Sequence, residues 1–431
     1  MNPTPISSIP VEILSIIFEE FCASSLSNSD CARPELTLTH VCQHWRELAT
    51  NLPDLWSNIL ASADTPSHIT TLYIARSQER CLDLDLDLRH DASDHLRRES
   101  ALGLWSLIKT TTSRWRKLNI QIGPHDATAF SEDLREVGAP RLETLQVSSA
   151  SHIAGLTKIF EGGSPCLKSL RLVGLSLLRF TPSTDSLTHL DLMSNCPMQF
   201  ATFAKIMNRM VCLEDLTIRS RVVEGWPTHP TQEDIIHLPS LAVLKISDRR
   251  WPLFIPLLSI VAPKLHTLSL YDLVAHDLPD TASEHQLRSN LPEVTNCILR
   301  GGSTYIDEDD FGQLSRMFPK VSHFGMIDVD EFFVKQSSTY MHKVSIWPRL
   351  QTISMMPAVG EELLCSLITA RTVPTTETQL QTVMLPIPTQ LKRIDWMSQK
   401  VNIKKCDDSD ALRLSTIAAE LTFAVQPQRQ T

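Results

Sequence analysis

Three short stretches of the sequence combine residue types that bind metals or carry out acid–base chemistry in other proteins. His40 and His44 lie four residues apart in a predicted helix, a spacing that places two imidazoles on one face and is compatible with a metal site. The third and fourth ligands that such a site needs are not evident in the sequence. We therefore interpret the two histidines as part of a solvated helix face.

The stretch CLDLDLDLRH, residues 81–90, contains three aspartates at the spacing that begins a calcium-binding loop: Asp83, Asp85 and Asp87. Position six of such a loop is glycine and position twelve is glutamate, whereas Leu88 and Asp94 occupy these positions here. The strict alternation predicts instead a strand with its leucines inward and its aspartates in water. We expect an edge or capping strand that its like charges protect.

The acidic run DEDDF, residues 307–311, predicts the N-terminus of a helix, where carboxylates interact favourably with the helix dipole. It does not resemble a pair of catalytic carboxylates. The nucleophile elbow, the dinucleotide-binding glycine pattern and the phosphate-binding loop do not occur in the sequence. The sequence predicts a protein that is not an enzyme, with no metal site and no cofactor.

The composition is that of an ordinary globular protein. The 431 residues are 42% hydrophobic and 21% charged, which is ample for a large core in two or three domains or in one elongated domain. The formal net charge is −9. Nucleic acid is therefore not expected as the main partner, because phosphate binding requires clustered lysine and arginine.

Cysteine usage and hydropathy predict a soluble protein of the cytoplasm, the nucleus or both. The ten cysteines are scattered singly, without a C-x-x-C pair, and are too sparse for a disulfide scaffold. Residues 1–21 lack the basic region of a signal peptide and carry glutamates within their apolar stretch. The longest uncharged apolar run, WPLFIPLLSIVAP, is too short to span a membrane, so no membrane partner is expected.

Helical patterns rich in large apolar residues occupy the N-terminus. In IPVEILSIIFEEF, residues 9–21, Pro10 stands at a helix start. The apolar residues form one wide stripe: Ile13, Leu14, Ile16, Ile17, Phe18 and Phe21. Pro34 begins a short middle helix. Residues 41–52 follow as a further helix that Pro53 ends, with one apolar face made by Val41, Cys42, Trp45, Leu48, Ala49 and Leu52. So small a helical unit buries too little surface to be stable alone, and we expect it to have a partner.

Residues 8–58 resemble the F-box, the helical module that binds the Skp-type adaptor of cullin-RING ubiquitin ligases. The opening motif Leu-Pro-x-Glu-Ile/Leu of that family corresponds to Ile9, Pro10, Val11, Glu12 and Ile13. The motif Val-Cys-x-x-Trp-x-x-Leu corresponds to Val41, Cys42, Trp45 and Leu48, and the trailing Leu-Trp corresponds to Leu55 and Trp56. Ile9 replaces the usual leucine, and the loop from Cys22 to Glu35 is longer than the common form, as in related fungal F-box proteins.

The resemblance implies that these helices bind the adaptor, and through it a cullin. The residues implied in adaptor binding are Pro10, Ile13, Ile17, Val41, Cys42, Trp45 and Leu48. The alternative is that the helices merely cap a larger domain. In that case Trp45 is only a core residue.

Beyond these helices the chain repeats the pattern L-x-x-L-x-L, with a period between 20 and 28 residues. Six clear copies begin at Leu142, Leu167, Leu187, Leu213, Leu241 and Leu265. Weaker copies follow in LPEVTNCIL, FPKVSHFGM, WPRLQTISM and ETQLQTVML, and one copy precedes them in SRWRKLNIQI. The period is that of leucine-rich repeats, so about eleven units are predicted, each a short strand followed by a helix or an irregular crossover.

The segments between the strands support this assignment. Helical spacing recurs in residues 151–163, 200–210, 307–318 and 360–371. A proline two places before the first apolar residue predicts a recurring turn, at Pro140, Pro165, Pro239, Pro263, Pro292, Pro319 and Pro348. The usual asparagine after the strand is present only as Asn195, with Ala150, Leu175, Arg221 and Arg249 at equivalent places, so we expect irregular curvature. The alternative, a generic α/β fold whose strands repeat by chance, does not account for the recurring turns.

The third and fifth positions of each L-x-x-L-x-L strand are expected to point away from the core. With parallel strands about 4.8 Å apart, His189 should adjoin Asp215 and Arg171 should adjoin Asp191. We interpret these as exposed polar pairs and not as a catalytic dyad, because no nucleophile joins them. A protein-binding surface is predicted at Arg171, Asp191, Asp215, Arg219, Lys245 and Tyr271.

The predicted fold class is α/β. Residues 1–60 form an F-box-like helical domain, 61–112 a linker and capping strand, 113–387 the leucine-rich-repeat solenoid, and 388–431 a cap with one helix from residue 402 and a frayed tail. The resemblance implies a substrate-recognition subunit of an SCF-type ubiquitin ligase, which holds a target protein of unknown identity. An F-box scaffold outside ubiquitination is the alternative. A hydrolase would need a constellation of catalytic residues that the sequence does not contain.

Overall fold

The structure is a computed structural model that describes residues 9–25, 33–91, 93–123, 127–149, 159–177, 186–194, 197–247, 252–274, 277–301, 304, 306–343, 345–356, 360–372, 379–386 and 391–406. The chain divides into two compact units, residues 1–186 and 187–431.

The first unit begins with three helices, α1 (Val11–Ser25), α2 (Pro34–Val41) and α3 (Gln43–Thr50), followed by a 3-10 turn at Pro53–Trp56. The carbonyl of Pro10 accepts the first helical hydrogen bonds, so the predicted helix start is confirmed. The helix predicted for residues 41–52 is confirmed as α3, but it is shorter than predicted and begins at Gln43. Cys42 is extended, and its Sγ accepts a hydrogen bond from the backbone N–H of Trp45 at 3.4 Å, so Cys42 caps α3 instead of continuing α2.

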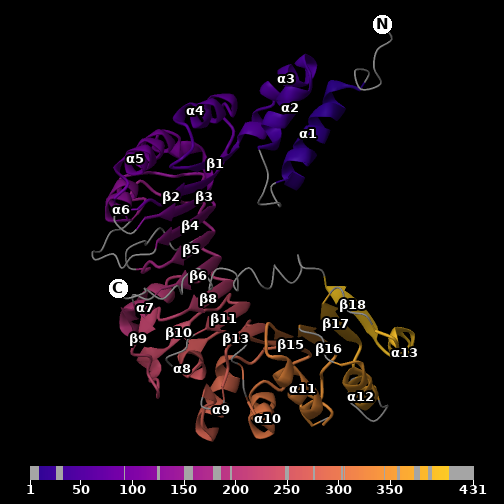
Figure 1. Ribbon diagram of the computed structural model, residues 1–431. Coiled ribbons are helices and arrows are strands. Elements are labelled where there is room, and N and C mark those ends of the chain that lie inside the picture. Colours follow the sequence, from indigo (N-terminus) through magenta and orange to yellow (C-terminus); the bar gives the residue numbers. More distant parts are fainter. Residues whose placement is uncertain are drawn as a thin grey trace. The chain divides into compact units, whose positions relative to one another are not determined.

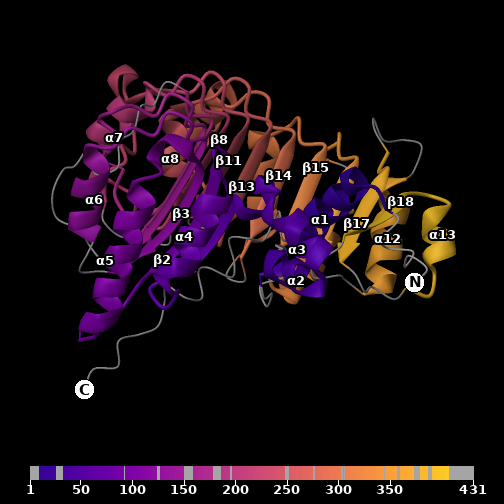
Figure 2. The same ribbon diagram turned by 90° about the horizontal axis from the view of Figure 1, so that it is seen from above.

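Five strands of the first unit form a parallel sheet in sequence order. They are β1 (Asn58–Ser62), β2 (Leu82–Leu88), β3 (Trp115–Ile122), β4 (Thr144–Ser149) and β5 (Ser169–Val173). The helices between them are α4 (Ser67–Arg76), α5 (His95–Lys109) and α6 (Ala127–Arg135), with a 3-10 turn at Thr112–Arg114. Figures 1 and 2 show α4–α6 along one face of the strands and α1–α3 on the other side. We call the strand face opposite α4–α6, and its equivalent in the second unit, the open face.

The predicted alternation of the LDLDLDL stretch is confirmed in β2. Leu84 and Leu86 are buried, at 2% and 0% exposure, while Asp85 is exposed on the open face. The expectation that this is an edge strand is wrong, because β1 pairs with it on one side and β3 on the other. The sequence of β1, NILAS, is too short and too irregular for a strand to be predicted from it.

Nine further parallel strands follow in sequence order in the second unit. They are β6 (His189–Met193), β8 (Asp215–Arg219), β11 (Val243–Ser247), β13 (Thr267–Tyr271), β14 (Asn296–Arg300), β15 (His323–Ile327), β16 (Thr352–Met356), β17 (Thr382–Pro386) and β18 (Asn402–Cys406). Two-residue strands form two separate pairs, β7 (Met198–Gln199) with β9 (Val223–Glu224) and β10 (Ile236–His237) with β12 (Ile260–Val261). The helices are α7 (Phe200–Met207), α8 (Phe254–Leu258), α9 (Thr281–Asn290), α10 (Glu308–Met317), α11 (Glu331–Tyr340), α12 (Glu361–Arg371) and α13 (Ile394–Ser398), with a 3-10 turn at Gln232–Asp234.

The leucine-rich-repeat prediction is confirmed, because each of the predicted repeat frames carries a strand of the parallel sheets. All six first leucines are fully buried. The proline turns are confirmed as well: the N–H of Leu142 bonds to the carbonyl of Ala139 at 3.2 Å, and Leu265 bonds to Ala262 at 3.1 Å. Each bond closes a turn in which proline takes the second position, where its fixed φ is favourable.

The helical predictions between the strands are confirmed for α7, α10 and α12. The acidic start of α10 is confirmed in detail, because Asp307 caps the helix and exchanges reciprocal hydrogen bonds with Asp310. The helix predicted from residue 402 is wrong at its start, since Asn402–Cys406 forms β18 and pairs with β17. Residues 407–431 lie outside the described residues, as do 151–158, Ala150, Asn195 and Arg249.

Several strands end in a left-handed residue at the position where the chain turns away from the sheet. These residues are Gly174, Ser220, Asp272, Gly301 and Asp328, with φ of 74°, 61°, 53°, 93° and 56°. At Gly174 a Cβ atom would lie 1.8 Å from the carbonyl oxygen of Ser149. The turn therefore requires glycine there for two reasons, the backbone conformation and the close approach of the neighbouring strand.

Candidate interaction surfaces

Helix α1 presents an apolar face to solvent. Its period places Leu14 and Phe18 inward, at 1% and 0% exposure. Five large apolar side chains on the remaining surface are between 42% and 56% exposed: Val11, Ile13, Ile16, Ile17 and Phe21. We call these five residues the α1 apolar face. Val41 at the end of α2 is likewise 55% exposed. Large apolar side chains exposed in this number on one short segment indicate a surface that binds another molecule.

The residues predicted to bind the adaptor fall into two groups. Exposed to solvent are Pro10, Ile13, Ile17, Val41 and Cys42. Trp45 and Leu48 are half-buried, and the Trp45 ring packs on Phe18 with ring centroids 4.8 Å apart. Trp45 therefore packs against the buried side of α1. The prediction omitted Val11, Ile16 and Phe21, although the apolar stripe read from the sequence already included the last two.

Trp56 anchors the three N-terminal helices to the first repeat. Its ring is fully buried, its Nε1 donates to the carbonyl of Ala49 at 2.8 Å, and its centroid lies 5.1 Å from that of Tyr73. The Arg76 guanidinium covers the same indole ring, 4.3 Å from its centroid. From α4, the hydroxyl of Tyr73 donates to Glu35 of α2. These contacts fix α2 and α3 against α4, which packs on the strands.

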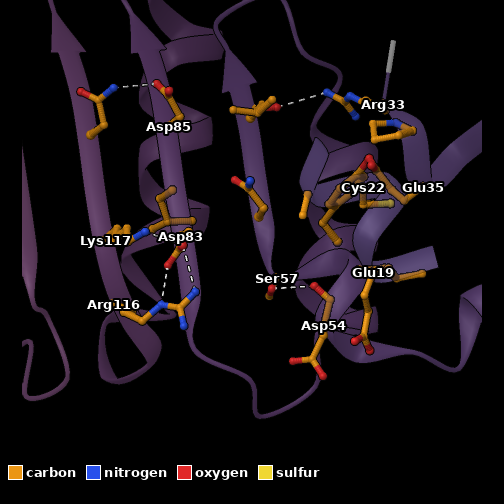
Figure 3. Close-up of a pocket in the computed structure, with 18 residues that line it drawn as sticks. Glu19, Cys22, Arg33, Glu35, Asp54, Ser57, Asp83, Asp85, Arg116 and Lys117 are labelled. Atoms are coloured by element: carbon orange, nitrogen blue, oxygen red, sulfur yellow. Dashed lines mark hydrogen bonds and ion pairs between the residues drawn. The ribbon is translucent and has the colours of Figure 1, made fainter. Parts of the chain in front are cut away.

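A cleft of 820 Å³ lies in the first unit between the helices α1 and α2 and the open face of β1–β3. Figure 3 shows the two walls, with Glu19, Cys22 and Glu35 on the helical side and Asp83, Asp85 and Lys117 on the strand side. Further lining residues are Ala23, Arg33, Pro34, Asp54, Leu55, Ser57, Asn58, Leu60, Tyr73, Leu84, Arg116 and Asn119. The sequence does not reveal this cleft, because its walls come from segments that are distant along the chain.

The cations on the strand wall are already paired. Arg116 donates two hydrogen bonds to Asp83, at 2.8 and 2.9 Å, and the Lys117 amine lies 3.5 Å from the same carboxylate. Asp85 accepts a hydrogen bond from the Asn119 amide at 3.1 Å. Among the described residues, Asp85 and Glu19 form no ion pair.

Glu35 is buried in the cleft wall at 7% exposure. Burial raises the pKa of its carboxyl group, an effect that its own backbone N–H and the nearby Arg33 oppose in part. Burial, together with the Glu35 carboxylate, also raises the pKa of the Cys22 thiol to about 11. Cys22 is therefore a neutral thiol and not a nucleophile at physiological pH.

The residues predicted to bind a target lie on the open face, and they differ in accessibility. Arg219 is 1% exposed and forms a two-bond ion pair with Asp191, at 2.7 and 3.3 Å. Tyr271 is 7% exposed, with the guanidinium of Arg300 5.7 Å from its ring centroid. Lys245 is accessible and lies 3.0 Å from Asp215. The sixth residue, Arg171, is half-buried in β5 of the first unit.

The predicted proximity of His189 and Asp215 is confirmed, since the two residues are register partners in β6 and β8. Asp215 pairs with Lys245, however, and the His189 ring bonds to the Thr188 hydroxyl at 2.8 Å. The proximity of Arg171 and Asp191 stays a prediction, because these residues belong to different units. None of the six third positions is buried: His189 is exposed and the other five are half-buried. Two of the fifth positions, Thr217 and Ser269, are buried.

His40 and His44 lie on different helices, α2 and α3, and both are exposed. Within the described ranges, no group of three or more histidine, cysteine, aspartate or glutamate side chains is arranged to hold a metal ion. No helix in the same part of the chain is long and apolar enough to cross a membrane.

No protein-family model matches the chain, and no curated protein matches it either. Similar solved structures include the leucine-rich repeat-containing protein LegL7 from Legionella pneumophila, at 14% identity and a TM-score of 0.38, over 72% of this chain and 99% of that one. A protein from Bacteroides fragilis is 12% identical, with a TM-score of 0.33, over 73% of this chain and 84% of that one. At such TM-scores the assignment of the fold rests on the repeats and strand order of this chain itself.

Proposed function

We propose that the chain is the substrate-recognition subunit of an SCF-type ubiquitin ligase in the cytoplasm or nucleus. The N-terminal helices bind a Skp-type adaptor, and the open face of the repeats binds a target protein. The chain supplies no acid, base or nucleophile to ubiquitin transfer. Its contribution is to hold the target near the ubiquitin-bearing subunits, which raises the effective concentration of the reacting groups.

The observation that carries this proposal is the α1 apolar face. It lies in the segment that resembles the F-box, and two of the residues implied in adaptor binding, Ile13 and Ile17, are 48% and 45% exposed on it. Half-exposed isoleucines on one helix are costly in water and favourable in an interface. On the open face, Asp215 and Lys245 are accessible contact residues for the target.

The test is co-purification of the full-length chain with the Skp-type adaptor, comparing wild type with an Ile13→Asp, Ile17→Asp double variant. Burying an unpaired carboxylate costs several kcal/mol, so adaptor affinity should fall by more than about tenfold. Both side chains are already half-exposed in the free chain, so the variant should keep its circular dichroism spectrum and melting temperature.

The matched control is Leu96→Asp, because Leu96 is 79% exposed on α5, outside the α1 apolar face. This variant should bind the adaptor like wild type. Wild type that does not bind the adaptor, or a double variant that binds it equally well, would refute adaptor binding through this face.

A further inference from the structure

We propose that the cleft between α1–α2 and β1–β3 binds an extended basic segment of the target protein, with lysine or arginine side chains at Asp85 and at Glu19. This inference rests on the proposed function only in naming the occupant as a target of the ligase. The site itself is argued from the geometry and charge of the first unit.

The cleft has the dimensions of a recognition site. Its volume of 820 Å³ lies within the range of about 300–1,000 Å³ that is typical of ligand pockets. Its two walls belong to different elements, but the Trp56 contacts and the bond between Tyr73 and Glu35 hold them together. Walls held in this way are preorganised, so little conformational entropy of the protein is lost when a ligand binds.

The charge of the cleft selects a cation. Five carboxylates line it, from Glu19, Glu35, Asp54, Asp83 and Asp85, against three cations, from Arg33, Arg116 and Lys117. Two of the cations share Asp83. The third, Arg33, donates to the Leu60 carbonyl at 3.3 Å and lies 5.3 Å from the Tyr73 ring centroid.

The remaining carboxylates are placed to accept hydrogen bonds from a ligand. Asp54 pairs with Arg80 at 3.1 Å, while Asp85 and Glu19 have no ion pair among the described residues. Figure 3 shows Glu19 on the helical wall and Asp85 on β2, at opposite ends of the cleft. A guanidinium or ammonium group at either carboxylate gains charge-assisted hydrogen bonds, whereas a phosphate-bearing ligand meets like charge.

The apolar part of the lining favours lysine or arginine on a peptide over a small hydrated cation. Leu60 on β1 is 47% exposed and lines the cleft together with Ala23. Long basic side chains place their methylene stems against such surfaces and their charged ends among polar groups. A target segment bound here also lies on the same unit as the α1 apolar face, close to the helices that bind the adaptor.

The experiment uses arrays of nine-residue peptides with arginine, lysine, citrulline or glutamate at the centre and varied flanking residues. The arrays are probed with the fluorescently labelled full-length chain, and the strongest sequences are then titrated by fluorescence polarisation. Citrulline is the matched neutral analogue of arginine. Peptides with central arginine or lysine should bind roughly tenfold or more tightly than the citrulline peptides, and the difference should shrink at high salt.

The preference should disappear in an Asp85→Asn, Glu19→Gln double variant. It should persist in Glu20→Gln, whose neighbouring carboxylate on α1 does not line the cleft. Equal binding of arginine and citrulline peptides to wild type, or an arginine preference that the double variant retains, would overturn the proposal.

The adaptor assay separates this inference from the proposed function. The Asp85→Asn, Glu19→Gln variant should still bind the adaptor, and the Ile13→Asp, Ile17→Asp variant should still prefer arginine peptides. If the adaptor does not bind while the arginine preference depends on Asp85 and Glu19, the proposed ligase role is wrong and the basic-peptide site stands.

Discussion

Charged side chains that are buried lower the folding stability of this chain. Glu35 is the clearest case, because it is 7% exposed and its carboxyl accepts a hydrogen bond from the Tyr73 hydroxyl. Burial raises its pKa above the ordinary value of 4.5. The folded state therefore holds a proton on Glu35 to higher pH than the unfolded state does, and the associated stability is lost as pH rises through the folded pKa.

We predict that Glu35→Gln raises the melting temperature at pH 7.5, because the amide keeps an acceptor for Tyr73 without a buried negative charge. The gain in melting temperature should shrink as pH falls towards 4.5. Wild-type Glu35 then takes up a proton in the folded state and no longer carries a buried charge. Thermal unfolding of both proteins from pH 4.5 to 7.5 checks this. A difference in melting temperature that is constant across the range would contradict the assignment.

At the scale of elements, the repeats depend on how each strand ends. Leucine-rich repeats usually place asparagine after the strand, and this chain mostly lacks it. Gly174, Ser220 and Asp272 instead take the left-handed conformation directly after β5, β8 and β13. Glycine, serine and aspartate are short, and the polar ones bond locally, so the turn is preserved without the family's signature residue.

We predict that Gly174→Ala destabilises the chain by about 2–4 kcal/mol, because a left-handed alanine is strained and its Cβ meets the Ser149 carbonyl. The matched control is Gly103→Ala in the middle of α5, where no atom lies within 4 Å of the added Cβ. That change should stabilise the chain by about 0.5–1 kcal/mol. Urea unfolding midpoints measure both, and midpoints that move in the same direction would refute the argument.

At the scale of the molecule, the proposed ligase role and the scaffold alternative make different demands. A scaffold holds its partner, whereas a substrate receptor causes its partner to be degraded. Both roles require the open face to bind the partner. Only the substrate receptor also requires α1 to bind the adaptor, because degradation of the partner depends on the adaptor. The two roles therefore differ in what happens to bound proteins when the α1 apolar face is removed.

We predict that cells expressing the Ile13→Asp, Ile17→Asp variant accumulate the chain's bound partners relative to cells expressing wild type. Quantitative mass spectrometry of captured proteins, with and without proteasome inhibition, measures this. Proteasome inhibition should raise the same proteins in wild-type captures and leave the variant captures unchanged. Partners present in equal amounts under all conditions would support the scaffold alternative.

The periodic features of this protein could be predicted from its sequence. Side chains repeat every second residue in a strand and every 3.6 residues in a helix, so Leu142 and its counterparts, the turn prolines and helices such as α10 are all visible locally. The motif residues of the N-terminal helices were visible in the same way. Isolated strands without such a pattern, β1 and β18, were not.

The tertiary structure decided everything that depends on distant segments meeting. In α1 it buried Leu14 and Phe18 and left Ile13 and Ile17 exposed to solvent. It placed Cys42 in an extended conformation between α2 and α3. It also buried Arg219 in an ion pair with Asp191. It also buried Arg371, whose guanidinium donates to four backbone carbonyls, and brought Glu19 and Asp85 to opposite walls of one cleft. Burial and charge pairing are sums over neighbours in space, and a sequence records only the neighbours along the chain.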